Sequence, residues 1–379
     1  MRQRLRTTFA GIAGLTLVGA MIAGPAGAAE PTSRAATAPT KTAPAKAATV
    51  KAPPVRKVVH RPIAFEVSNT NETSALCLAD NRPYVLRGRL VGPRSTMSGS
   101  PGRLRVNVLV HDAGTGAWFW NLRQAPAFDY ASQLARRGET SLVLDRLGYD
   151  RSPLANGHAT CLGAQATMLH QVVQHLYSGN YRFIDRANED DQPPHATHVV
   201  VHGHGTGATV AQLEAAEFAD VAGLVLMSAP TATPTGQALR AVTDQLGRCV
   251  GGDGYSAYGA TPAEFRSLLF ASAPAKVRRL ATARRNPTPC GDVSSLLTAV
   301  GSAVLGAGSV DVPVLVLSGG RDARVRRLDQ AGAEKMFSSS ARVWARTFAK
   351  AGSALPLEAG AAGVRETVLR FLAGVRPTL

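Results

Sequence analysis

Residues 199–208, Val-Val-Val-His-Gly-His-Gly-Thr-Gly-Ala, constrain the fold of this chain more than any other segment. Three consecutive valines are typical of a strand that is buried on both faces. Glycines then occupy every second position, which allows the backbone to turn sharply. Small and apolar residues from 206 to 218 favour a helix after the turn. The segment therefore predicts a strand, a tight turn and a helix, in that order.

The same alternation of extended and helical segments continues along most of the chain. Strands are predicted at residues 84–91, 104–110, 141–144, 198–201, 222–227, 312–317 and 342–348, and helices at 128–137, 161–177, 206–218 and 364–371. Near-continuous apolar strands separated by helices predict an α/β fold with a mostly parallel central sheet flanked by helices. Residues 231–310 break the alternation with a glycine-rich turn, prolines and short helical pieces. They predict a cap inserted after the sixth core strand.

The N-terminal residues predict export. Residues 1–28 combine three arginines, an apolar run over 9–23 and a small-residue cleavage site, the pattern of a signal peptide. Residues 29–62 are rich in Ala, Pro, Thr and Lys, with too few large apolar groups to form a core, and predict a disordered basic linker. Residues 63–379 then form the folded domain. Neither a transmembrane helix nor a lipid anchor is predicted, so we expect a secreted, extracellular protein.

The charge of the chain is concentrated before the folded domain. The formal net charge is +16, yet residues 63–379 carry 32 basic and 25 acidic side chains. Arginine outnumbers lysine 35 to 7, which is typical of GC-rich codon usage. A basic stripe with interleaved aromatic residues is absent from the sequence, so no nucleic-acid partner is predicted. The basic linker could contact acidic cell-wall polymers weakly.

Four cysteines predict two disulfides. They lie in an exported chain without Cys-x-x-Cys spacing or neighbouring histidine ligands, which favours disulfides over metal. Of the three possible connectivities we favour Cys77 with Cys161 and Cys249 with Cys290, because the second pair closes a single insertion.

Several motifs lie at the ends of the predicted strands, and together they resemble the α/β-hydrolase family, in particular its secreted bacterial members. The resemblance covers residues 84–372. Its landmarks are His111-Asp112-Ala113 after one strand, Asp145-Arg146-Leu147-Gly148-Tyr149 after the next, the elbow Gly203-x-Gly205-x-Gly207, then Gly319-Gly320-Arg321-Asp322 and Ala351-Gly352-Ser353. The resemblance implies a Ser-His-Asp triad served by an oxyanion hole.

The chain departs from that triad at its key positions. Gly205 stands where the nucleophilic serine is expected, and Ser353 stands where the histidine is expected. The acid is retained as Asp322. Without a nucleophile no acyl-enzyme forms, and without an imidazole no group there exchanges protons near neutral pH. No catalytic residue is therefore predicted.

The oxyanion loop also departs from the family. Ala113 and Thr206 are the residues whose backbone N–H groups the resemblance assigns to the oxyanion hole, and the Thr206 hydroxyl is expected to point away from the cleft. Asp112 replaces a glycine of this loop, where its charge would oppose a developing oxyanion.

The remaining candidates are structural or pocket residues. Asp322, with no histidine to orient, is expected to pair with Arg321 and Arg324. His111, Asp112 and His204 are the candidates for lining a ligand pocket, although the two histidines are also expected to brace the oxyanion loop and the elbow. His202 and His204 lack a third ligand, so neither a metal nor a cofactor is predicted.

Three functions remain open from the sequence. The first is a secreted protein without triad catalysis, which binds a small apolar or ester-like ligand under its cap or serves as an interaction module. The second is an ester hydrolase that uses an unrecognised nucleophile or a water activated by Asp322 or Asp112. The third is dinucleotide binding through Gly203-x-Gly205-x-x-Ala208, although the next strand ends without an acid for the ribose.

Overall fold

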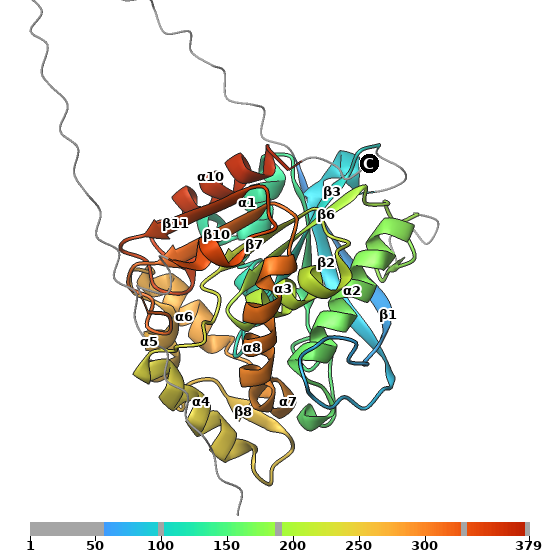
Figure 1. Cartoon of the computed structure of the whole chain (residues 1–379). Helices are drawn as coiled ribbons and strands as arrows, with labels where there is room; N and C mark the ends of the chain where they lie inside the picture. The colour runs from blue at the N-terminus through green and yellow to red at the C-terminus, as the bar shows by residue number, and fades with distance from the viewer. Residues whose placement is uncertain (1–56, 98–101, 186–191, 327–331, 376–379) are drawn as a thin grey trace, which may run out of the picture. The chain divides into compact units, whose positions relative to one another are not determined.

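The computed structural model describes residues 57–97, 102–185, 192–326 and 332–375. The predicted signal peptide and residues 29–56 of the predicted linker lie outside this range. In the described part, nine strands form one sheet (Figure 1). Their order across the sheet is β11 (Val343–Phe348), β10 (Val314–Gly319), β7 (Gly223–Met227), β6 (His198–His204), β3 (Arg105–Val110), β4 (Thr140–Asp145), β2 (Pro83–Pro93), β1 (Val58–Ser68) and β5 (Arg182–Phe183).

Six neighbouring strands of the sheet, from β11 to β4, run parallel to one another. The β2 strand pairs antiparallel with β4 and with β1, and β1 pairs antiparallel with β5. The central strand β6 lies between β3 and β7, with His202 opposite Leu109 on one side and Val225 on the other. The C-terminal ends of β3, β6 and β10 therefore open at the same edge of the sheet. The mostly parallel sheet predicted from the sequence is confirmed.

Helices cover both faces of the sheet, which explains why its strands are apolar on both sides. On one face lie α2 (Leu162–Ser178), α3 (Thr206–Phe218) and α8 (Leu296–Gly306), and on the other α1 (Tyr130–Arg136) and α10 (Ala361–Leu372) (Figure 1). Val199 and Val201 of β6 belong to the first core, whereas Val200 belongs to the second. Alternate side chains of one strand thus support opposite layers.

The segment between β7 and β10 contains the residues predicted as a cap. Its elements are α4 (Gly236–Cys249), β8 (Tyr255–Ala257), α5 (Pro262–Leu269), α6 (Ala275–Ala283), β9 (Pro287–Pro289), α7 (Cys290–Ser294) and α8. A capping box between Thr261 and Glu264 begins α5. Helix α8 packs through Ala299 and Ala303 into the same core as α2 and α3. The last part of the segment is therefore also part of the main domain.

The boundary of the predicted linker at residue 62 is wrong, because β1 begins at Val58. All eleven residues of β1 pair with β2, from Val58 opposite Pro93 to Ser68 opposite Pro83. The Arg61 side chain lies over the ring of Phe183 and pairs with Asp185. Basic residues and a proline made these residues resemble the linker in composition, whereas tertiary pairing fixes them as a strand.

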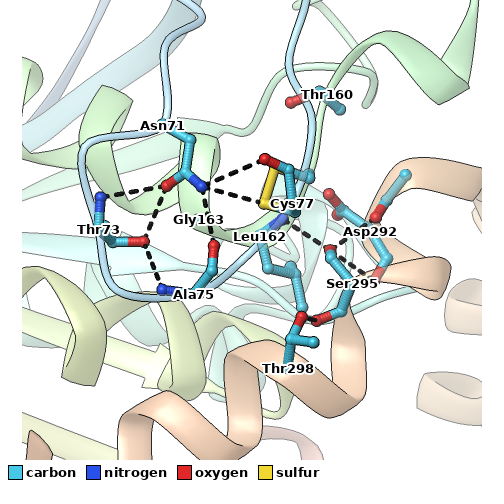
Figure 2. The surroundings of a disulfide bond; sticks show 12 residues. Asn71, Thr73, Ala75, Cys77, Thr160, Leu162, Gly163, Asp292, Ser295 and Thr298 are labelled. Atoms are coloured by element: carbon cyan, nitrogen blue, oxygen red, sulfur yellow. Dashed lines mark hydrogen bonds between the residues drawn. A yellow bond between two sulfur atoms is a disulfide. The ribbon is translucent and has the colours of Figure 1, made fainter.

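The structure joins Cys77 to Cys161 and Cys249 to Cys290, the pairing favoured by the sequence. The first bridge ties the loop before β2 to the N-terminus of α2. Figure 2 shows Asn71 within this loop, where its amide nitrogen donates to the carbonyl of Ala75 at 2.8 Å. The second bridge joins the end of α4 to the start of α7 and so closes a loop within the cap segment.

Candidate functional site

The elbow between β6 and α3 retains a sharp turn although it carries no serine. Gly205 has φ 55° and ψ −125°, a conformation that side-chain-bearing residues rarely adopt. The flanking glycines are needed for close packing. A Cβ on Gly203 would overlap the backbone of Ala208, and one on Gly207 would overlap the carbonyl of Val110.

A carboxylate occupies the space in front of this elbow. Asp112, which follows β3, accepts hydrogen bonds at Oδ1 from the backbone N–H groups of Ala113 and Thr206, each at 2.8 Å. These are the two amides that the sequence assigned to the oxyanion hole, and both donate to one oxygen of Asp112. A Cβ built on Gly205 would overlap the carboxyl group of Asp112. This carboxylate and a side chain at Gly205 therefore exclude each other.

The expectation for the Thr206 hydroxyl is wrong. Thr206 Oγ1 donates to Asp112 Oδ1 at 3.1 Å and accepts from the N–H of Ala113 at 2.9 Å, so it points toward the oxyanion loop. The reason is the carboxylate itself, which offers an acceptor where the family's glycine has none.

Arg324 lies at the centre of the site. Its guanidinium donates to Asp112 Oδ2 and to the hydroxyl of Ser353, and at 3.2 Å to the hydroxyl of Tyr258 from the cap segment. The Arg324 side chain is 9% exposed and that of Asp112 is 1% exposed. The two form a buried ion pair between the loops that follow β10 and β3.

Asp322 supports Arg324 from the same loop. Its Oδ1 accepts the backbone N–H of Arg324 at 2.8 Å and lies 3.8 Å from Nε of the same residue. The predicted pairing with Arg324 is therefore present, but the guanidinium points mainly to Asp112. Arg321, the other predicted partner, has an exposed side chain. Burial raises the pKa of Asp322, against the opposing charge of Arg324.

The position predicted for the base is buried beside a histidine from another strand. Ser353 lies in the loop after β11, and both its hydroxyl and its carbonyl oxygen lie 3.1 Å from Nε2 of His204. The His204 ring stacks on Phe119 at 4.3 Å. His202 instead contacts the hydroxyl of Tyr130 at 3.0 Å, so the two histidines have separate partners.

Burial and charge set the ionisation of these groups. Burial alone would raise the pKa of Asp112, but the charge of Arg324 and the N–H of Thr206 hold it at about 2. The pKa of Arg324 is raised well above its usual value, because the attraction of Asp112 outweighs burial. Burial lowers the pKa of His204 to about 4 and that of His111 to about 3. At neutral pH the pair is charged and both histidines are neutral.

A cavity of about 240 Å³ lies between this ion pair and the cap segment. Helices α4 and α8 supply most of the apolar wall of the cavity. The rest of the wall includes polar and loop residues, among them Asp112, Ala113, Thr206, Ser228, Tyr258 and Arg324. Leu239 and Leu297 line the cavity and are 55% and 70% exposed, which places them at its mouth.

Of the three predicted pocket residues, only Asp112 lines this cavity. His111 and His204 do not line it, and both side chains are fully buried. His111 stacks edge-on against Tyr149 at 4.7 Å, and its Nδ1 contacts the carbonyl of Asp112 at 2.9 Å. Both histidines contact the loops that they were expected to brace, and this role stays a prediction.

Sequence reasoning missed three contributions to the site. Arg324 was expected only as a partner of Asp322, and Tyr258 was not singled out. The cavity wall also contains Asp292, which accepts from Arg146 at 2.7 Å and from Tyr149 at 2.9 Å. The only signal for Arg324 in the sequence was its position two residues after Asp322. Nothing in the sequence indicated that cap residues would reach the ion pair.

Comparison with known proteins identifies the class. Residues 108–367 match the model of the alpha/beta hydrolase family. This chain belongs to that family.

Solved structures share the fold at low sequence identity. A thermophilic esterase from Thermogutta terrifontis matches with a TM-score of 0.56 and 18% identity, over 82% of this chain and 99% of that one. A peroxisomal alpha-beta-hydrolase from Saccharomyces cerevisiae has a TM-score of 0.53 and 13% identity, over 85% and 93%. An esterase from Exiguobacterium antarcticum has a TM-score of 0.52 and 17% identity, over 80% and 98%. No curated protein sequence matches the chain.

Proposed function

We propose that this chain is an exported α/β-hydrolase-fold protein that has lost triad catalysis and binds a small apolar or ester-like ligand in the cavity under its cap segment. The observation that carries the proposal is the position of the Asp112 carboxylate. It accepts both oxyanion-hole amides and fills the space next to Gly205 that a serine side chain would need.

The electrostatics of the site support loss of catalysis. An oxyanion hole accelerates acyl transfer because its donors are free to bind charge that develops in the transition state, at about 3 kcal/mol per donor. Here both donors already bind a permanent negative charge, which Arg324 neutralises. A substrate carbonyl would therefore have to displace a buried ion pair before it could be polarised.

Activation of a water molecule by an aspartate is the second candidate function, and the geometry disfavours it. Asp112 has a pKa of about 2 and is paired with Arg324, so it is a weak base at neutral pH. Asp322 bonds to the backbone of Arg324 and is not part of the cavity wall. Dinucleotide binding is disfavoured as well, because the Asp112 carboxylate lies where a pyrophosphate would approach Gly205.

The ligand class follows from the cavity. Its volume of about 240 Å³ suits a short acyl chain or a small ester, and its wall contains Val242, Val293, Leu296 and Val300. Esterases among the structural neighbours are a precedent for such ligands in this fold.

Export remains part of the proposal. Two disulfides suit an oxidising compartment, and the helices that the structure describes are too short or too polar to cross a membrane. A weak contact of the basic linker with acidic cell-wall polymers stays a prediction from the sequence.

Labelling and binding test the two halves of the proposal. A fluorophosphonate should leave the mass of the protein unchanged, and p-nitrophenyl butyrate should not be hydrolysed above background. A stoichiometric adduct on any serine or threonine would overturn the loss of catalysis.

For binding, Gly301 offers a matched pair of variants. It lines the cavity, and a Cβ there meets no atom within 4 Å, so Gly301→Leu should fill the cavity without strain. We expect wild-type protein to bind an uncleaved alkyl ester, seen by native mass spectrometry, and Gly301→Leu to lose at least tenfold in affinity. Gly247→Leu on α4, equally open but outside the cavity wall, is the control. Equal binding by both variants would refute the cavity as the site.

A further inference from the structure

A second cluster of polar side chains lies on α2 and α3, and none of its members lines the cavity described above. His170 belongs to α2, Glu214 to α3, and Asp220 to the turn between α3 and β7. One potential ligand atom from each lies within 4.8 Å of the others. Figure 1 shows the two helices next to each other, and their packing brings together residues 44 and 50 positions apart in the sequence.

Glu214 is the unusual member of this cluster. Its side chain is completely buried, and neither carboxylate oxygen has a hydrogen-bond partner among the described residues. Oδ1 of Asp220 likewise has none. Its other oxygen, Oδ2, lies 2.8 Å from Nδ1 of His170 and accepts from Gln174 at 2.5 Å. Three carboxylate oxygens in one buried place thus lack a donor.

An ionised Glu214 would be costly in this place without a cation. An isolated buried carboxylate is strongly disfavoured unless it is paired or coordinates a metal. Burial, together with the neighbouring carboxylate of Asp220, raises the pKa of Glu214 well above its usual value. No lysine or arginine forms an ion pair with Glu214 or Asp220 in the described part of the chain. Among the described residues, the cluster therefore has ligands for a cation and no lysine or arginine that supplies the positive charge.

We propose that His170, Glu214 and Asp220 bind one divalent metal ion, of which Zn²⁺ fits best. One imidazole nitrogen and two carboxylate oxygens are ligands that Zn²⁺ accepts, and water can complete a tetrahedral set of four. Two carboxylates balance its charge. Ca²⁺ and Mg²⁺ prefer sites made of oxygen ligands alone, which His170 does not provide.

The metal would join α2, α3 and the turn before β7. Because a carboxylate must be deprotonated to act as a ligand, binding should weaken as the pH falls. It should also stabilise the folded state by mass action, with a rise in Tm of roughly 5 °C at a hundredfold excess over Kd.

Calorimetry on the full mature chain tests this site. The protein is purified without a polyhistidine tag, treated with a chelator and titrated with ZnCl₂. We expect one ion per chain and a Kd in the micromolar range or below. Parallel titrations use MnCl₂ and CaCl₂, and tighter binding of Ca²⁺ would overturn the assignment to Zn²⁺.

Two variants separate ligation from folding. In Glu214→Gln the amide keeps the volume of the side chain and can donate to Asp220, so the fold should persist while Zn²⁺ affinity falls about 100-fold. His175→Gln is the matched control, because His175 lies on the same helix but contacts the carbonyl of Glu66 at 2.8 Å. Absence of stoichiometric binding to wild-type protein, or wild-type affinity in a folded Glu214→Gln variant, would overturn the proposal.

Discussion

Replacing Arg324 by methionine tests how the loops around the elbow are held together. The substitution keeps much of the length of the side chain but removes the charge that compensates Asp112, whose side chain is 1% exposed. Removal of one partner from a buried ion pair typically costs about 3–5 kcal/mol, because the other charge stays buried without compensation. We therefore expect Arg324→Met to lower the free energy of unfolding by about 3–5 kcal/mol at pH 7.

The pH dependence of stability should change sign in this variant. In wild-type protein the pKa of Asp112 is about 2 when folded, against 3.8 as the ordinary value. A lowered folded pKa means that its contribution, roughly 2 kcal/mol, is present above pH 4 and is lost as pH falls from 4 to 2. Without Arg324, burial dominates and raises the pKa of Asp112 above 3.8. The variant should then lose stability as pH rises through that higher pKa.

Urea unfolding followed by circular dichroism at pH values from 3 to 8 measures both effects. Arg321→Met is the control, because Arg321 lies in the same loop with an exposed side chain. It should change the free energy of unfolding by less than about 0.5 kcal/mol. The reasoning fails if Arg324→Met costs less than 1 kcal/mol at pH 7 and keeps the wild-type pH profile.

Three further predictions concern the elbow, the cap segment and a helix start. Gly205→Ser should destabilise the protein by at least about 1–3 kcal/mol through backbone strain. The cost should be smaller in an Asp112→Gly background, where the new side chain no longer overlaps the Asp112 carboxyl group. Equal costs in both backgrounds, measured by urea unfolding, would contradict this geometry. Replacing Cys249 and Cys290 by serine opens a loop of 41 residues and should cost up to about 4 kcal/mol, and peptide mapping without reductant should recover this pair in wild-type protein. Thr261→Ala removes the capping box of α5 and should lower the free energy of unfolding by about 1 kcal/mol, measured by thermal unfolding. An unchanged Tm would argue against a stabilising role of this capping box.

The sequence by itself determined the core of the fold. Runs such as Val199-Val200-Val201 can be buried only in a strand that is covered on both faces, and helix α3 begins and ends at the residues predicted for it. The local sequence pattern did not predict the start of β1, because Pro62 and the basic residues around it resemble a linker. Only the pairing of β1 with β2 shows that these residues form a strand.

The sequence also predicted that Gly205, which has no hydroxyl, stands at the position of the nucleophile. It could not indicate which group lies in front of this glycine. Asp112 and Arg324 are 212 residues apart, and their contact depends on β3 and β10 ending at the same edge of the sheet. The same limit applies to His170, Glu214 and Asp220, whose spacing matches no local motif.

The tertiary structure alone decided which polar groups are buried together. The periodicity of apolar residues along a strand or a helix predicts which side chains face the core. It does not predict which loops, far apart in the sequence, lie in contact. At Asp112, for example, one carboxylate accepts from the backbone amides of Ala113 and Thr206, the Thr206 hydroxyl and the Arg324 guanidinium, which belong to three different segments of the chain.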